Sequence, residues 1–118
     1  SVHYYSPSTF CIADKKSNSW GYSGSWGTEA DYKAMRRDFE KMKKFTDAGY
    51  GVIIGEYGVC HNTDGGKYVM KKGTDKFLRS VKDLSIEMGY CAMIWDCSDW
   101  FNRKTQSYNY DFLKDIYD

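Results

Sequence analysis

Two stretches of the chain, forty positions apart, share one pattern of hydrophobic and polar residues. Residues 47–56 read DAGYGVIIGE and residues 87–96 read EMGYCAMIWD. In each copy a Gly, which readily takes the left-handed conformation that ends a helix, precedes a short apolar run that finishes on an acid. Such a continuous apolar run is typical of a buried parallel strand. We therefore predict strands over residues 51–57 and 92–97.

Apolar residues at helical spacing precede both predicted strands. The first helix should begin at Thr28 as its N-cap, with Glu29 and Asp31 in the first turn, where negative charge suits the helix dipole. Its apolar stripe comprises Tyr32, Met35, Phe39, Met42 and Phe45. The second helix should start near Thr74, with the stripe Phe77, Val81, Leu84 and Met88. A third, shorter helix is expected from about Asn109, packing through Phe112, Leu113 and Ile116.

With a further strand over residues 2–5, strands and helices alternate along the chain, which implies parallel strands with right-handed crossovers. An open doubly wound sheet and a (β/α)8 barrel both use this unit. No Gly-rich phosphate-binding turn follows any strand, which favours the barrel. The predicted fold class is α/β: a partial (β/α)8 TIM barrel with three parallel βα units.

Three units are fewer than the eight of a complete barrel, which needs about 250 residues. The partial sheet would leave two edges unpaired and apolar surface in water. We therefore expect self-association into a homo-oligomer, or association with a missing N-terminal barrel segment. The chain begins at Ser1 without an initiator Met or a secretory signal, which suggests a processed product or a fragment.

The composition limits the kinds of partner that the chain is expected to bind. The 118 residues carry a formal net charge of +1, so no long-range field would attract nucleic acid or an anionic membrane, and we expect neither as a partner. No apolar run is long enough to span a membrane. Aromatic residues make up 18% of the chain, and their rings either pack internally or stack on sugars and at interfaces.

Four cysteines, Cys11, Cys60, Cys91 and Cys97, form no CxxC pair and no zinc pattern. Cys91 and Cys97 are expected on one strand, where a mutual disulfide is disfavoured. Free, packed thiols are the predicted state, with a single bridge as the alternative.

Functional residues of α/β barrels follow the C-terminal ends of the strands. This rule selects residues 3–7, residues 55–58 and residues 95–100. Glu56 stands out, because a carboxylate that ends an apolar strand is costly to bury unpaired. The flanking Gly55 and Gly58 leave room for close approach by a ligand or backbone. The alternative is a structural Glu that pairs with a Lys or Arg at the rim.

Three motifs in this order, VHYYSP (2–7), VIIGEYG (52–58) and IWDCSDWFNR (94–103), resemble the last three strands of glycoside hydrolase family 5, the (β/α)8 cellulases. The loop PSTFCIADKKSNSWG (7–21) and the ending of the third motif resemble the subfamily of endoglucanases, xyloglucanases and mixed-linkage glucanases. The resemblance implies that residues 1–118 are the C-terminal segment of a catalytic barrel. It also implies a secreted or cell-surface enzyme that acts on β-glucan with no metal or other cofactor.

The resemblance also implies roles at matching positions. Glu56 corresponds to the nucleophile, His3 to a histidine that lines the site and Tyr5 to the tyrosine whose hydroxyl hydrogen-bonds the nucleophile. Trp95 corresponds to the floor of the subsite in which the sugar is attacked. These types suit the chemistry, since a hydroxyl donor stabilises an ionised carboxylate and a Trp face packs on glucose. For His3 the alternative is a rim histidine, and for Trp95 it is core packing.

A retaining glycosidase needs a second carboxyl group about 5–5.5 Å from the first. In the family this acid/base lies in an Asn-Glu pair, which does not occur in this chain; an early-strand arginine of the family also has no counterpart. Asp96 occupies the same position in the second copy of the repeat as Glu56 does in the first. If Trp95 faces the sugar, however, strand alternation points the Asp96 side chain to the opposite side. We expect Asp96 to orient its loop or to hydrogen-bond backbone.

The loops after the strands carry further rings: Trp20, Tyr22, Trp26 and Trp100. They either stack on glucosyl units or anchor the loops, and Trp20 and Trp100 are the better candidates for substrate binding. The leading hypothesis is thus a fragment of a retaining endo-β-1,4-glucanase that is inactive alone. The alternatives are a non-catalytic, self-associating half-barrel module that at most binds glucan, and an open-sheet domain that binds another small molecule.

Overall fold

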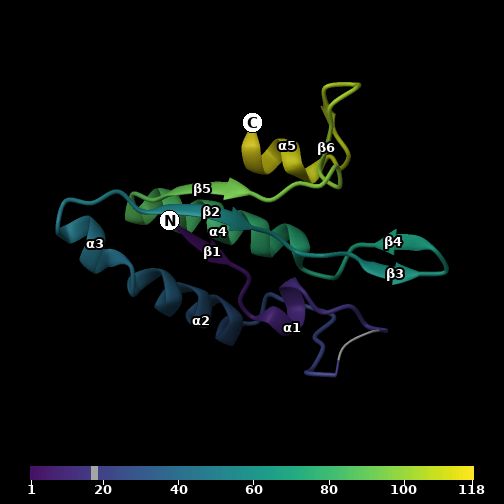
Figure 1. Cartoon of the computed structure of the whole chain (residues 1–118), viewed down its shortest axis with the longest axis horizontal. Helices are drawn as coiled ribbons and strands as arrows, with labels where there is room; N and C mark the ends of the chain where they lie inside the picture. The colour runs from purple at the N-terminus through teal and green to yellow at the C-terminus, as the bar shows by residue number, and fades with distance from the viewer. Residues whose placement is uncertain (17–18) are drawn as a thin grey trace.

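A three-stranded parallel sheet forms the centre of the structure, which is a computed structural model that describes residues 1–16 and 19–118 (Figure 1). Its strands, in spatial order, are β1 (Val2–Tyr4), β2 (Ile53–Tyr57) and β5 (Cys91–Ile94). Both pairings, β1 with β2 and β2 with β5, are parallel. The predicted parallel sheet is therefore confirmed, although the strands are shorter than predicted. Cys97 lies beyond β5, so the expectation that it shares a strand with Cys91 is wrong.

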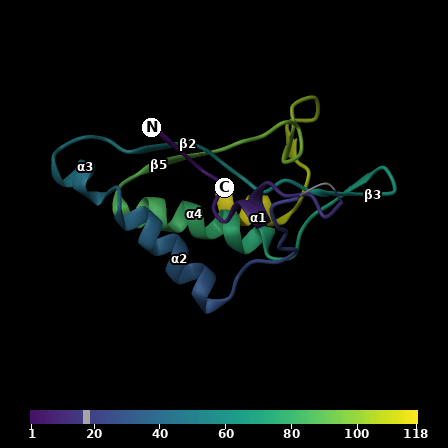
Figure 2. The same cartoon turned by 60° about the horizontal axis from the view of Figure 1, so that its bottom comes forward.

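Helices cover one face of this sheet (Figure 2). They are α2 (Glu29–Glu40) and α4 (Thr74–Met88), with α5 (Phe112–Tyr117) packed against α4, while the short α3 (Lys43–Asp47) follows α2 and has no buried residue. The predicted cap of α2 is confirmed: the Asp31 N–H donates to Thr28 Oγ1 at 3.2 Å, and the Thr28 N–H donates to Asp31 Oδ2 at 2.9 Å. The single helix predicted through Phe45 is wrong, because it divides into α2 and α3. Phe45 is 48% exposed, so little burial holds these turns in one helix.

The remaining elements lie in the connections. Helix α4 starts at Thr74 as predicted and ends at Gly89, whose φ of 74° is left-handed. Helix α5 starts three residues later than expected. Sequence patterns did not predict α1 (Ser8–Cys11), the hairpin of β3 (Asn62–Asp64) and β4 (Lys67–Val69), or the hairpin of β6 (Phe101–Asn102) and β7 (Ser107–Tyr108). Residues 17 and 18 of the loop motif lie outside the described residues.

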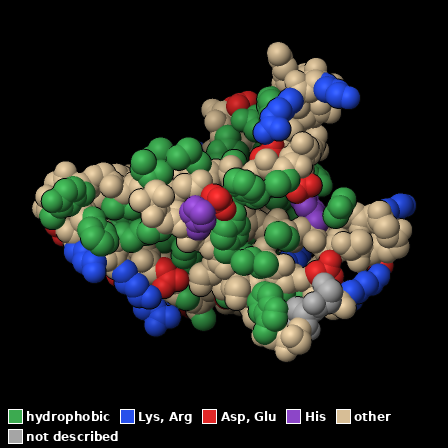
Figure 3. All heavy atoms as spheres, viewed as in Figure 1, with side chains coloured by type: hydrophobic (Ala, Val, Ile, Leu, Met, Phe, Trp, Pro, Cys, Tyr) green, Lys and Arg blue, Asp and Glu red, His purple; other side chains and the backbone are tan. Residues whose placement is uncertain are grey.

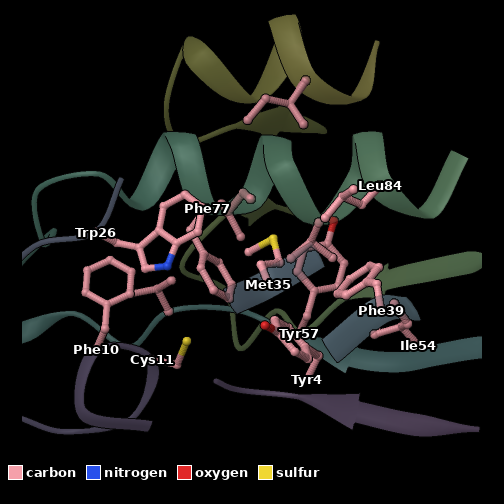
Figure 4. Packing of buried hydrophobic residues seen from close by; sticks show 14 of the residues in the cluster. Tyr4, Phe10, Cys11, Trp26, Met35, Phe39, Ile54, Tyr57, Phe77 and Leu84 are labelled. Atoms are coloured by element: carbon pink, nitrogen blue, oxygen red, sulfur yellow. The ribbon is translucent and has the colours of Figure 1, made fainter. Parts of the chain in front are cut away.

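The core lies between the sheet and the helices and is rich in aromatic rings (Figure 4). Phe77 of α4 is fully buried and stacks on Tyr4 of β1 at a centroid distance of 6.1 Å. Trp26 is only 5% exposed and meets Phe77 edge to face at 5.4 Å. Trp26 therefore anchors its loop to the core, which is one of the two roles considered for this ring.

The opposite face of the sheet is open. Ile53, Met93 and Trp95 are 41%, 49% and 52% exposed, whereas Ile54 and Tyr57, which point to the helices, are at most 1% exposed. Viewed onto the strands, hydrophobic side chains gather over β2 and β5 (Figure 3). The apolar runs thus predicted burial that the structure shows on one face only, because α2 and α4 lie on the same side. Within the described residues, no helix is long and apolar enough to cross a membrane.

All four cysteines are free thiols, as predicted, but only Cys11 is packed in the core. Cys60, Cys91 and Cys97 are exposed, so the expectation of packed thiols is wrong for these three. The reason is their position: Cys91 points to the open face of the sheet, and the other two lie in loops after strand ends.

Candidate active site

Three strands bring the predicted site residues to one edge of the sheet. Because the strands are parallel, their C-terminal ends meet, and Tyr5, Glu56 and Trp95 come from these ends. His3 of β1 pairs with Glu56 of β2 across the ladder. The edge is therefore where side chains from β1, β2 and β5 can act together.

A β-bulge in β2 sets the direction of Glu56. Val2 pairs with Ile54, yet the next residue of β1, His3, pairs with Glu56, so Gly55 is an extra residue in β2. The pairing with β5 shifts over the same residues, between Ile54 and Tyr57. With strict alternation, Glu56 would point to the helices like Ile54. The bulge re-aims the carboxylate and lets Ile54 and Tyr57 both be buried.

The Glu56 carboxylate has two side-chain partners. The Tyr5 hydroxyl donates to Glu56 Oε2 at 3.0 Å, and His3 Nδ1 lies 3.5 Å from the same oxygen. The Glu56 side chain is 26% exposed, so solvent and ligands can reach it. Within the described part of the chain no Lys or Arg forms an ion pair with Glu56, which disfavours the alternative of a structural Glu at the rim.

The environment keeps Tyr5 in its donor form. Burial and the hydrogen bond to the Glu56 carboxylate raise the pKa of the Tyr5 hydroxyl well above its ordinary value. The phenol thus stays protonated and donates to a carboxylate, a hydrogen bond that favours the ionised acid. In the described residues no hydrogen bond to Glu56 Oε1 is found, so this oxygen is free for a ligand.

Trp95 lies at the same edge on the open face of the sheet, 52% exposed. Its N–H donates to Tyr57 O at 2.8 Å, which fixes the start of the loop beside Glu56. Within the described residues the Trp95 ring is therefore not packed in the core. A β-carbon on Gly58 or Gly55 would be 3.6 Å from its nearest neighbour, which is an ordinary contact. Within the described residues, therefore, no backbone or side chain approaches either glycine so closely that only Gly would fit.

Asp96 caps the loop that follows β5. Its Oδ1 accepts the Trp100 N–H at 3.0 Å, which confirms the prediction that Asp96 hydrogen-bonds backbone. Trp100 is only 4% exposed, and its ring packs against His61 at a centroid distance of 4.9 Å and Tyr110 at 5.9 Å. In this arrangement Trp100 anchors the loop, so the loop-anchoring alternative fits its exposure better than stacking on a sugar.

Trp20 remains a candidate for stacking. It is 53% exposed in the loop between α1 and α2, which begins soon after Tyr5. Sequence analysis missed the cluster of His61, Trp100 and Tyr110, in which the Tyr110 hydroxyl lies 3.4 Å from His61 Nε2. These residues are distant in the sequence and share no periodicity. Among the described residues, no group of three or more His, Cys, Asp or Glu could hold a metal ion.

These features define a class: an α/β fragment whose parallel strands present a carboxylate and aromatic rings at their C-terminal ends, the edge at which α/β barrels carry their functional residues. Residues 1–99 match the family described as Cellulase (glycosyl hydrolase family 5). The chain therefore belongs to glycoside hydrolase family 5.

Individual relatives are endoglucanases. Endoglucanase H of Acetivibrio thermocellus is 25% identical over 98% of the chain, which spans 12% of that protein. A broad-specificity endoglucanase of an uncultured bovine rumen ciliate is 29% identical with a TM-score of 0.82 over 97% of this chain and 36% of its own. Cel5A of Thermotoga maritima, solved with cellobiose, is 18% identical with a TM-score of 0.74, over 97% and 37%. The chain thus spans only about a third, or less, of these relatives.

Proposed function

We propose that this chain is the nucleophile-bearing part of a retaining endo-β-1,4-glucanase that hydrolyses cellulose or a related β-glucan by double displacement. The observation that carries the proposal is the Glu56 carboxylate, which the bulge aims at the open edge and which receives the Tyr5 hydrogen bond. Membership of family 5 and similarity to endoglucanases support the same reaction.

In this proposal Glu56 Oε1 attacks the anomeric carbon and forms a covalent glycosyl-enzyme, which water then hydrolyses. The Tyr5 hydroxyl, held 3.0 Å from Oε2, keeps the carboxylate ionised and oriented. His3, 56% exposed beside the same carboxylate, lines the pocket for the attacked sugar. The exposed face of Trp95 forms the floor beneath that sugar, and Trp20 binds a more distant unit.

The second carboxyl group comes from outside these 118 residues. Asp96 is occupied with the Trp100 backbone, so it is a poor acid/base. We infer that residues 1–118 correspond to the last three βα units of the barrel and that the missing acid lies in an earlier unit. Either that earlier segment or a second copy of the chain would cover the open sheet face. Secretion or display at the cell surface is part of the same proposal.

A second candidate function is a non-catalytic module that self-associates and at most binds glucan. The open face with Ile53, Met93 and Trp95 favours it, because exposed apolar sheet surface promotes association. The mass of the chain in solution, measured with and without cello-oligosaccharide, shows whether the chain associates with copies of itself.

Hydrolysis by the isolated chain tests the proposal. Protonation of the leaving oxygen supplies about 10²–10⁴-fold in rate, so the purified chain should not measurably hydrolyse carboxymethyl-cellulose. Robust turnover by the chain alone, abolished by Asp96→Asn, would show that Asp96 is the acid/base and would overturn the proposed division of the site. Binding of cellohexaose without turnover is the expected outcome.

A further inference from the structure

Two cysteines that are distant in the sequence lie on adjacent backbone segments. The Cys60 N–H donates to Cys11 O at 2.8 Å, which joins the end of α1 to the loop between β2 and β3. With one backbone hydrogen bond of 2.8 Å between them, ordinary bond lengths keep the two Cα atoms within about 7 Å of each other. Disulfides span Cα separations of about 4.4–6.8 Å, so the two main chains lie near the range that a disulfide bridges.

The two thiols share one electrostatic environment. Burial raises the pKa of both Cys11, to about 12, and Cys60, and in both cases the Lys71 ammonium opposes that rise. Lys71 Nζ donates to Phe10 O at 2.5 Å and to Ala13 O at 2.6 Å, so the cation is fixed beside the segment that carries Cys11. A fixed cation favours thiolate, the reactive form of cysteine, but burial outweighs this effect and keeps the pKa of both thiols above its ordinary value.

The two cysteines differ in access to solvent. Cys60 is exposed, whereas Cys11 is fully buried. An oxidant can therefore reach Cys60 first, and Cys11 is the neighbour that can resolve the product. Once formed, a bond to the buried sulfur would be shielded from reductants on one side.

We propose that Cys11 and Cys60 form an oxidation site, which a two-electron oxidant such as a peroxide converts to a disulfide. The Cys60 thiolate attacks one peroxide oxygen and breaks the O–O bond, giving a sulfenic acid and hydroxide. The Cys11 sulfur then attacks the Cys60 sulfur, the S–O bond breaks, and the Cys11 proton leaves with that oxygen as water. Two thiols are oxidised, and one peroxide is reduced to two waters.

The bond would link the two segments that follow the candidate active-site residues Tyr5 and Glu56. Helix α1 begins three residues after Tyr5, and Cys60 lies four residues after Glu56. The disulfide would therefore connect the segment that follows Tyr5, the hydroxyl donor, to the segment that follows Glu56. Because the site is defined by its thiols, its test does not depend on glucan hydrolysis.

Peptide mapping tests the site. The chain is treated at low concentration with hydrogen peroxide, remaining thiols are alkylated, and the protein is cleaved without reduction by trypsin and chymotrypsin. Lys15 and Lys44 separate Cys11 from Cys60, and cleavage after Trp95 separates Cys91 from Cys97. The expected product is a monomer two hydrogen atoms lighter, with peptides of Cys11 and Cys60 joined.

Single substitutions provide the controls. Cys60→Ser alters an exposed residue and should abolish the cross-link, whereas Cys91→Ser and Cys97→Ser should leave its yield unchanged. Cys97 also lies in a loop after a strand end, so a Cys60–Cys97 link that disappears in Cys97→Ser would overturn the proposal. Links only between chains, or two unlinked thiols after peroxide treatment, would overturn it as well.

Discussion

Lys71 offers a sharp test of how the segment behind Tyr5 is held. Its side chain is 3% exposed, and its ammonium donates to two carbonyls, Phe10 O and Ala13 O, in the turn that ends α1. The change Lys71→Met keeps most of the unbranched stem but removes both hydrogen bonds. The carbonyls of two buried residues then lose this donor, and an unsatisfied buried acceptor lowers the stability of the folded state.

The expected magnitude follows from these contacts. Hydrogen bonds from a charged donor contribute about 1.5–3 kcal/mol each. The low end applies, because burial lowers the pKa of Lys71 and its removal relieves that desolvation. Two bonds at about 1.5 kcal/mol give a loss of about 3 kcal/mol in the free energy of unfolding.

Urea denaturation followed by tryptophan fluorescence measures the loss. The matched control is Lys72→Met, since Lys72 is the exposed neighbour of Lys71 and its substitution should change stability by less than about 0.5 kcal/mol. Equal stability of the two variants, or a more stable Lys71→Met, would refute the reasoning that the buried ammonium holds α1 in place.

Two further predictions concern the stability of the fold: one compares two glycine substitutions, and the other follows the pH dependence of unfolding. A β-carbon on Gly73, whose φ is 87°, would be 2.0 Å from Trp26 O, whereas one on Gly89 would meet nothing within 4 Å. In urea unfolding, Gly73→Ala should therefore cost well over 2 kcal/mol and Gly89→Ala about 1 kcal/mol, and equal costs would contradict the steric argument. Burial lowers the pKa of His61, so as pH falls below about 6.5 the unfolded chain binds a proton more readily and stability decreases. Unfolding measured at about pH 5 and about pH 8 should show this loss, and His61→Phe should reduce it; an unchanged pH dependence would speak against a buried neutral His61.

The sequence predicted the parts of the fold that depend on local pattern. The repeat around residues 47–56 and 87–96 predicted two βα units and the common edge at which Glu56 and Trp95 lie. The cap at Thr28 and the stop at Gly89 were predicted because their chemistry is confined to a few neighbouring residues.

Features that depend on pairing between distant segments were missed. The bulge at Gly55 exists only relative to β1 and β5; a Gly inside an apolar run is compatible with a bulge but does not establish one without the pairing. Trp100 was named as a substrate-binding candidate because it lies in a loop after a strand end, but the loop sequence does not show that His61 and Tyr110 pack against its ring. The apolar runs predicted burial on both faces of the strands, but such a run does not show which segment covers each face, and in the described residues the helices cover one face only.

Covalent labelling of the candidate nucleophile tests the central proposal most directly. A 2-deoxy-2-fluoro-cellobioside with a dinitrophenolate leaving group needs no acid to depart, so a chain without the acid/base can still form the glycosyl-enzyme. We predict slow attachment of one fluorinated cellobiosyl group to the peptide of Glu56, lost in Glu56→Gln and retained in Asp96→Asn. Label on any other carboxylate, or no label on Glu56, would contradict it.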